Sequence, residues 1–358
     1  MHNKLISFLA LIIALLGPSY CVAEDTITIG RGTGVLWEGL PFNVTLSGPM
    51  GNAAMATQYG LMNITDKNYV CMSSTDLTTI GAFKAIQIAP GVGLIPRATV
   101  KATYTAYDGS TKTITGTIGL PDTRAGDSGE LISPPGFEWC LPPGMTNNNY
   151  FYSPNGSRVV NLTGTWALVT DGTQTTYTGG IPTMYASSFS VVKVGDKYQS
   201  ILPASLNLRV TTLECTVDTP TVINFGTVAR NLTVNTELAK QTNSFNVSCS
   251  QSSDKISTNI AVQFRALTSF YEGSINRLAL SQGGGYITGE IPGVTDSGVC
   301  DGASGINFNN QAINIGRINM YMPTYTILNK VIWRLCSGGS TLPSGPVSAS
   351  TEMLVTFN

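Results

Sequence analysis

The chain has 358 residues, of which only 11% are charged, and its formal net charge is −1. It contains no run of Lys or Arg, so it lacks the clustered basic surface that nucleic-acid binding requires. Its content of aliphatic and aromatic residues is too high for a disordered chain. This composition is typical of an extracellular all-β protein, and we expect no nucleic-acid partner.

Residues 1–23 have the pattern of a secretory signal peptide. A short start containing Lys4 is followed by the apolar run 5–17 and by small residues that end at Ala23. The apolar run is shorter than the roughly 20 residues that a spanning helix needs, which disfavours the alternative of a membrane anchor. We therefore expect cleavage after Ala23 and export of the remaining chain. About 335 residues remain, more than one core usually organises, so two domains are expected.

The cysteines indicate disulfides divided between these two domains. Removal of Cys21 with the signal peptide leaves six cysteines, and an even number in an exported chain favours three disulfides. Six cysteines allow fifteen pairings, but a long gap between the second and third separates them into two groups. No C-x-x-C pair occurs, which disfavours zinc, and we expect no metal or cofactor. The expected pairs are Cys71–Cys140 in the first domain, and Cys215–Cys249 and Cys300–Cys336 in the second.

Histidine is confined to the signal peptide, where His2 is the single example in the chain. The exported protein therefore has no Ser-His-Asp or Cys-His nucleophile system and no imidazole metal ligand. Two carboxylates would suffice for a glycosidase, but nothing singles out a pair among the 21 acidic residues. We expect that the protein is not an enzyme.

Strand patterns and turn residues alternate along most of the chain. Residues 100–106 and 112–120 flank Asp108-Gly109 and predict a β-hairpin. Two more hairpins are predicted, from 162–169 to 173–180 and from 187–194 to 197–202. The last residues, 351–358, alternate like a half-buried strand. The fold class expected is all-β, with two immunoglobulin-like β-sandwich domains.

The C-terminal part resembles the pilin domains of chaperone–usher fimbriae. Cys215 precedes the segment INFGTV, and a strand-like FNVSC ends at Cys249. Gly345 is the fourteenth residue from the C-terminus, and the aromatic Phe357 is the penultimate residue, as in those subunits. The resemblance covers residues 209–358, which we take as the second domain. The third disulfide expected above is not part of the common pilin pattern.

The pilin resemblance implies an incomplete sandwich that lacks its last strand. A periplasmic pilin chaperone would first fill the groove beside the C-terminal strand. The subunit would then pass through an outer-membrane usher, and the N-terminal extension of the adjacent fimbrial subunit would replace the chaperone. The alternative is an ordinary last strand of a complete sandwich. The residues expected to contact the chaperone or donor strand are Gly345, Met353, Val355, Phe357 and Asn358, the last through its carboxylate.

Residues 24–208, the first domain, indicate a place at the end of the fibre. They precede Cys215 and are predicted to fold around their own disulfide, so no free tail remains to donate to a neighbour. This layout resembles the two-domain tip adhesins of type 1 and P fimbriae, whose N-terminal domain is usually a lectin. The resemblance implies export through the periplasm to the fimbrial tip, where the chain would bind a host glycan or glycoprotein.

The candidate glycan site rests on a weaker resemblance to N-acetylglucosamine-binding fimbrial lectins. Asp108 follows Cys71 by 37 residues, Trp139 precedes Cys140, and a polar loop contains Asn147, Asn148 and Asn149. By resemblance, Asp108 would accept sugar hydroxyls, Trp139 would stack on the sugar and the asparagines would contact it. Each has a structural alternative: core packing for Trp139, turn chemistry for Asp108 and a solvated loop for the asparagines. The family favours Thr, Ser and Gln in that loop, so the sugar stays open.

The sequence thus predicts a fimbrial tip adhesin for host-surface glycans, anchored by donor-strand complementation. Three alternatives remain: an adaptor tip pilin without a receptor, an adhesin for a protein receptor, and a secreted carbohydrate-active enzyme.

Overall fold

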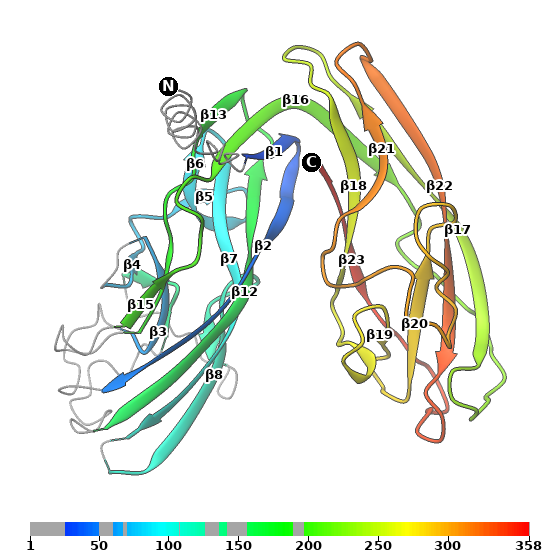
Figure 1. Ribbon diagram of the computed structural model, residues 1–358, viewed down its shortest axis with the longest axis horizontal. Helices are drawn as coiled ribbons and strands as arrows, with labels where there is room; N and C mark the ends of the chain where they lie inside the picture. The colour runs from blue at the N-terminus through cyan, green and yellow to red at the C-terminus, as the bar shows by residue number, and fades with distance from the viewer. Residues whose placement is uncertain are drawn as a thin grey trace, which may run out of the picture.

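The computed structural model describes residues 26–49, 60–66, 70–106, 108–125, 136–141, 156–188 and 197–357. Within these ranges the regular secondary structure consists of strands, apart from one 3-10 turn at η3 (Tyr271–Gly273). The expected all-β fold is therefore confirmed (Figure 1), while its immunoglobulin-like character stays a prediction. The signal peptide, Asn147 to Asn149 and Asn358 lie outside the described residues.

Two separate hydrophobic cores organise these strands. The first core includes residues from Ile27 to Val210, and the second includes residues from Leu213 to Leu342. We call the strands around them the first unit and the second unit; they lie side by side, and β16 (Asn207–Asp218) passes from one to the other (Figure 1). The cores divide close to the expected boundary at 208/209, although the boundary itself stays a prediction.

The main sheet of the first unit has seven strands. Its order is β2-β12-β7-β6-β5, with β8 paired to β7 and β9 to β8. A four-stranded sheet, β11-β3-β14-β15, and a small pair, β10-β4, complete the unit. The strands are β2 (Thr33–Pro49), β3 (Met62–Thr65), β4 (Met72–Ser73), β5 (Thr78–Ile80), β6 (Phe83–Ala89), β7 (Val92–Thr105), β8 (Thr111–Gly119), β9 (Arg124–Ala125), β10 (Phe137–Glu138), β11 (Cys140–Leu141), β12 (Ser157–Asp171), β14 (Tyr185–Ser188) and β15 (Lys197–Ser200).

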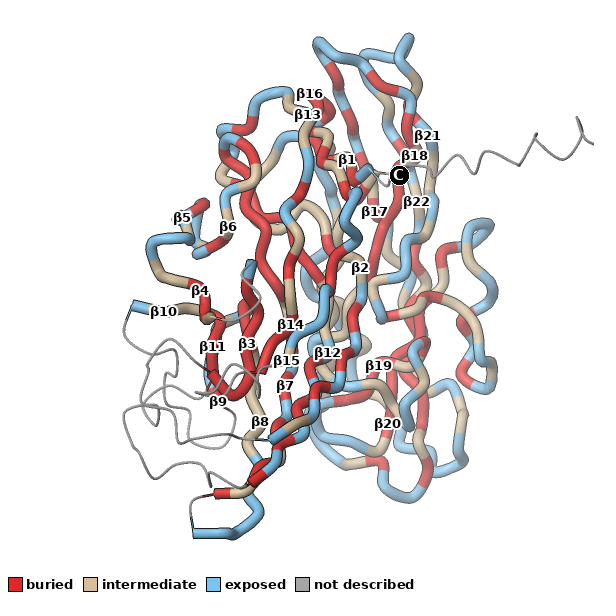
Figure 2. The backbone as a smooth tube through the Cα atoms, turned by 60° about the vertical axis from the view of Figure 1, so that its left-hand side comes forward, coloured by how far each residue is buried: buried red, intermediate tan, exposed pale blue. Residues whose placement is uncertain are grey.

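Period-two alternation explains how the central strand β12 is buried. Val160 and Leu162 point into the first core and are fully buried, while the adjacent Val159 and Asn161 are exposed. Trp166, also fully buried, donates its ring N–H to the carbonyl of Ile201 at 3.2 Å. Figure 2 shows that β3 and β11, in contrast, are buried along their whole length.

The remaining strands surround the second core and the junction. Their order is β19-β20-β22-β17-β16-β1-β23-β18-β21, with β13 paired to β16. The short β1 pairs in parallel with β16 and touches β23 only where Thr28 faces Phe357. The strands are β1 (Thr26–Arg31), β13 (Tyr177–Gly180), β17 (Glu237–Ser250), β18 (Thr258–Ala266), β19 (Leu278–Ala279), β20 (Gly285–Glu290), β21 (Ile313–Ile318), β22 (Thr324–Ser337) and β23 (Thr351–Phe357).

All three expected disulfides are confirmed. Cys71–Cys140 links the residue before β4 to β11 in the first unit, and the other two bonds lie in the second unit. The bond Cys215–Cys249 joins β16 to β17, whose residues at these positions are direct partners.

Of the three predicted hairpins, one is confirmed, one is confirmed only as a strand pair in which Ser188 faces Lys197, and one is wrong. Strand β7 pairs with β8 around the turn at Asp108-Gly109, where Gly109 has φ 81°. Strand β14 pairs with β15, although their turn lies outside the described residues. Strand β13 pairs with β16 instead of folding back on β12. The reason is that β2 and β7 already occupy both edges of β12.

Candidate functional site

Strand β23 is paired along one edge and largely open along the other. All its residues, from Thr351 to Phe357, pair with β18. On the opposite edge, the strand pairings of the described residues include only the contact of Phe357 with β1. An edge strand exposes a row of unpaired backbone N–H and C=O groups, which can template another strand. The backbone groups between Thr351 and Thr356 that face away from β18 are therefore the ones that a partner strand could bind.

Backbone hydrogen bonds on the far side of β18 show which β23 residues face the open edge. Asn310 donates its N–H to the carbonyl of Phe264 at 3.0 Å, so Phe264 directs its backbone away from β23. Met353 is its partner, and in such an antiparallel pair the two backbones point in opposite directions. The N–H of Met353 therefore faces the open edge, whereas that of Leu354 faces Gln263 on β18.

The core-facing side chains of β23 are incompletely buried. Met353, Val355 and Phe357 pack against the second core, yet each stays partly exposed. By contrast, Phe264 on the neighbouring strand β18 is fully buried, as expected for a strand with partners on both edges. An added strand would cover apolar surface that the chain alone leaves in contact with water.

The segment 219–236, which contains INFGTV, is not a strand in this structure. Ile223, Phe225 and Val228 pack partly on the second core, while Val222 is 78% exposed. Like the apolar side chains of β23, those of this segment contact the second core but stay partly exposed to water.

The chain's own β1 limits the open edge at one end. At Gly30 the chain passes so close to β16 that a Cβ would lie 1.9 Å from the carbonyl oxygen of Leu213. The same Cβ would lie 3.0 Å from the ring of Phe357. Strand β1 therefore occupies the position beside Phe357, and an incoming strand would end before it.

Gly345 lies in an exposed stretch before β23 and has φ 99°. A Cβ there would meet nothing within 4 Å, so the requirement for glycine at this position comes from the backbone conformation and not from a close contact. Its expected role with a chaperone stays a prediction.

The residues of the expected glycan site occupy different places. Asp108 lies in the exposed turn between β7 and β8, where its Oδ1 accepts from the N–H and hydroxyl of Ser110 at 2.9 and 2.5 Å. These two bonds lower the pKa of the Asp108 carboxyl. Trp139 lies between β10 and β11, is only 2% exposed and belongs to the first core. Its ring thus presents almost no surface on which a sugar could stack, which agrees with the core-packing alternative.

A hollow of about 400 Å³ nevertheless lies beside Trp139. The segment 136–139 forms one wall and is held in place by backbone bonds from Ser74 to Gly136 and from Ile64 to Trp139. Its other linings come from 82–84, Ile95 and the stretch 119–123.

The accessible aromatics of this hollow are Phe83 and Phe137, both partly exposed. The ammonium of Lys84 lies 2.8 Å from Oε1 of Glu138, and Asp122 adds a second carboxylate. Aromatic faces with nearby carboxylates suit a sugar, which has an apolar face and polar hydroxyls. The sequence predicted Trp139 and missed Phe137, because periodicity does not show which aromatic of a short segment is buried.

A second hollow, of about 650 Å³, lies on the outer face of β7, β8 and β12. Its lining includes Thr99, Thr115, Thr163 and Asn161 beside Lys101, and contains no aromatic residue. It therefore offers hydrogen bonds without a stacking surface, which makes it less suited to a sugar than the first hollow.

Among the described residues, no group of three or more His, Cys, Asp or Glu side chains could hold a metal ion. The same part of the chain contains no helix with the length and hydrophobicity needed to cross a membrane.

Comparisons with known proteins give limited information. No family model and no curated protein match the chain. One similar solved structure, described as a chaperone–tip adhesin complex vital for activation of CFA/I fimbriae biogenesis, is 12% identical; the alignment covers 93% of this chain and 95% of that one, with a TM-score of 0.23. The CupB6 tip adhesin from Pseudomonas aeruginosa is 14% identical over 91% and 87%, with a TM-score of 0.29. At these TM-scores the similarity carries no argument, so function must be argued from the residues.

Proposed function

We propose that this chain is a fimbrial tip adhesin, anchored to its fibre by a donor strand that binds along β23. The observation that supports this is the open edge between Thr351 and Thr356, beside the partly exposed Met353 and Val355. A strand added there would form backbone hydrogen bonds and bury the apolar side chains together. A lone apolar edge would otherwise invite aggregation, so a dedicated partner is required.

The partners follow from this proposal. A periplasmic chaperone holds the edge first, an outer-membrane usher exports the complex, and the N-terminal extension of the adjacent subunit replaces the chaperone. The chain ends at the fibre tip on the cell surface. Gly345, Phe357 and Asn358 contribute to chaperone contact in this proposal, on the strength of the pilin resemblance.

Strand docking can be tested by co-purification with a periplasmic chaperone. Val355→Asp places a charge on the partly exposed core side of β23 and should abolish capture. Leu328→Asp is the matched control, because Leu328 lies on β22 and is 76% exposed. Capture of the control and loss of the β23 variant are expected. Equal capture of both variants would show that the chaperone binds elsewhere.

The first unit would bind the receptor, a host glycan, without catalysis. The hollow beside Trp139 supports this assignment, since Phe83 and Phe137 supply aromatic surface and Glu138 supplies a hydroxyl acceptor. Asp108 and the loop with Asn147, Asn148 and Asn149 stay proposed contributors. Many fibres on one cell would compensate for weak individual binding.

A glycan array probed with the mature chain tests the receptor assignment. Phe137→Ala should remove binding, whereas Tyr321→Ala should not, because Tyr321 is 87% exposed in the second unit. If Phe137→Ala still binds the glycan, the binding site lies outside the hollow. If the parent chain binds no glycan, an adhesin for a protein receptor or an adaptor subunit is favoured. Cleavage of an oligosaccharide would favour a secreted carbohydrate-active enzyme.

A further inference from the structure

The contact between the two units contains a buried negative charge. Glu38 on β2 is only 3% exposed. Its Oε2 accepts from the Nε of Arg97 on β7 at 3.1 Å, and its Oε1 accepts from the hydroxyl of Thr165 on β12 at 2.7 Å. These partners all belong to the first unit. A buried carboxylate is costly unless it is paired, so this site must have a reason to keep the charge.

The second unit supplies two further contacts to the same residue. The Nε of Arg265 on β18 lies 3.8 Å from Oε2 of Glu38. Gln263, also on β18, donates from its side chain to the backbone carbonyl of Glu38 at 3.2 Å. Glu38 and Gln263 are 225 residues apart in the chain, so this contact joins the two units.

Arg265 also connects this contact to the C-terminal strand. Its Nε donates to Oε2 of Glu352 on β23 at 2.9 Å, and its backbone carbonyl accepts from the hydroxyl of Thr351 at 2.9 Å. Arg97, Glu38, Arg265 and Glu352 thus form a row of alternating charges, and the cluster is electrically balanced.

This cluster lies apart from a second attachment between the units. That attachment is the strand junction, where β1 pairs with β16 and reaches Phe357. Glu38 lies five residues beyond Thr33, the first residue of β2. In an extended strand, five residues span roughly 15 Å. On β23, Glu352 lies five residues from Phe357, a matching separation. One attachment alone would act as a hinge, whereas two separated attachments oppose rotation.

We propose that Glu38, Arg97, Arg265 and Gln263 form an interdomain latch that holds the two units in one fixed orientation. The role of Arg97 is to keep Glu38 charged and in place, and the role of Arg265 and Gln263 is to bind it from the second unit. This inference goes beyond the proposed function, because it holds whatever the receptor is and whether or not a strand docks.

The latch can be tested by measuring distances between spin labels in the mature chain. The six cysteines that the structure describes are all in disulfides, so single labels can be placed through Thr113→Cys in the first unit and Leu328→Cys in the second. Both positions are exposed. We expect one narrow distance peak for the parent chain. Glu38→Gln and Arg265→Gln should each broaden this distribution and remove its single peak.

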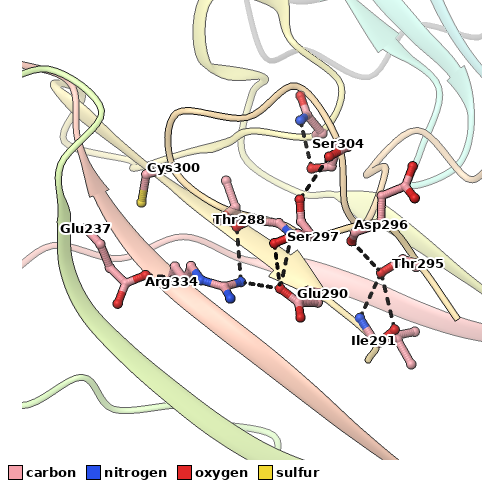
Figure 3. A network of polar contacts seen from close by, with 12 residues as sticks. Glu237, Thr288, Glu290, Ile291, Thr295, Asp296, Ser297, Cys300, Ser304 and Arg334 are labelled. Atoms are coloured by element: carbon pink, nitrogen blue, oxygen red, sulfur yellow. Dashed lines mark hydrogen bonds and ion pairs between the residues drawn. The ribbon is translucent and has the colours of Figure 1, made fainter. Parts of the chain in front are cut away.

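A matched control is available inside the second unit. Arg334 on β22 is buried and pairs with Glu290 at 2.8 Å and with Glu237 at 3.1 Å (Figure 3). Glu290→Gln weakens a buried ion pair within one unit, so it should lower stability and leave the narrow peak unchanged.

The outcomes separate a latch from a merely structural ion pair. Circular dichroism first shows that each variant is folded. If Glu38→Gln does not fold, Arg265→Gln decides, because the Arg265 side chain is partly exposed and its removal leaves the Glu38–Arg97 pair intact. A narrow and unshifted peak in folded Arg265→Gln would overturn the proposal, as would equal broadening in Glu290→Gln.

Discussion

Strands β12 and β23 share the same alternating pattern but differ in what covers their edges. Strand β12 pairs with β2 on one edge and β7 on the other. Strand β23 pairs with β18, while on its other edge the described strand pairings include only β1 at Phe357. The side chains follow this difference: Val160 on β12 is fully buried, and Val355 on β23 is half-buried.

The comparison teaches that burial of a strand requires its neighbours as well as its pattern. An apolar side chain on an open edge gains only part of the stabilisation that burial provides. The remaining part is released when a partner arrives, which makes the open edge a binding site and a source of instability at once. The following predictions test this difference between a closed and an open strand.

The largest effect is expected from proline on the closed side of β23. Leu354→Pro removes the N–H that faces Gln263 and leaves a carbonyl of β18 unpaired, which should cost about 2 to 4 kcal/mol. Met353→Pro removes an N–H that faces the open edge and should cost clearly less. Urea denaturation of the mature chain measures both, and Met353→Ala separates the loss of the side chain from that of the N–H. Equal costs would mean that both edges of β23 are occupied.

A smaller effect is expected from two matched valines. Val160→Ala empties space in the first core and should lower the free energy of unfolding by about 2 kcal/mol. Val355→Ala should cost less than about 1 kcal/mol in the free chain, because its site is already partly hydrated. Denaturation repeated with a bound strand should show a larger cost for Val355→Ala. A cost that is the same with and without the strand would argue against docking at β23.

The last effect appears only at alkaline pH and concerns β12 and its neighbour β7. Tyr104 on β7 is the partner of Arg158 on β12, and burial, together with the charge of Asp108, raises its pKa to about 12. In the unfolded chain the phenol loses its proton near pH 10, while the folded chain retains it. The stability contribution is therefore complete below about pH 10 and is lost as the pH rises towards 12.

Ultraviolet absorbance of the phenolate during a pH titration checks this sign. Tyr104→Phe should remove the late ionisation step and flatten the loss of stability above about pH 10. An unchanged profile in Tyr104→Phe would show that other groups dominate the alkaline limit.

Much of the fold could be predicted from the sequence because it depends on local signals. Alternation and the turn at Asp108-Gly109 correctly predict the hairpin of β7 and β8, and the spacing of the cysteines gives the three disulfides. The partner of β13 could not be predicted, because pairing depends on which edges other strands have already taken.

The candidate sites were predictable only in part. Alternation identified the core-facing residues of β23, but the open edge became visible only through the strand pairings. Trp139, the expected sugar platform, lines a hollow but is itself buried, and that burial depends on strands distant in sequence. The latch around Glu38 had no sequence signal at all, since a single acidic residue in a strand is ordinary until Arg97 and Arg265 are seen beside it.

Hydrogen exchange along β23, followed by nuclear magnetic resonance in the mature chain, tests the central claim most directly. In the free chain we expect rapid exchange at Met353 and Val355, whose N–H groups face the open edge, and slow exchange at Leu354, which faces β18. Addition of a periplasmic chaperone should slow Met353 and Val355 and leave Leu162 on β12 unchanged as an internal reference. Slow exchange at Met353 and Val355 in the free chain, or no change when the chaperone binds, would contradict the account.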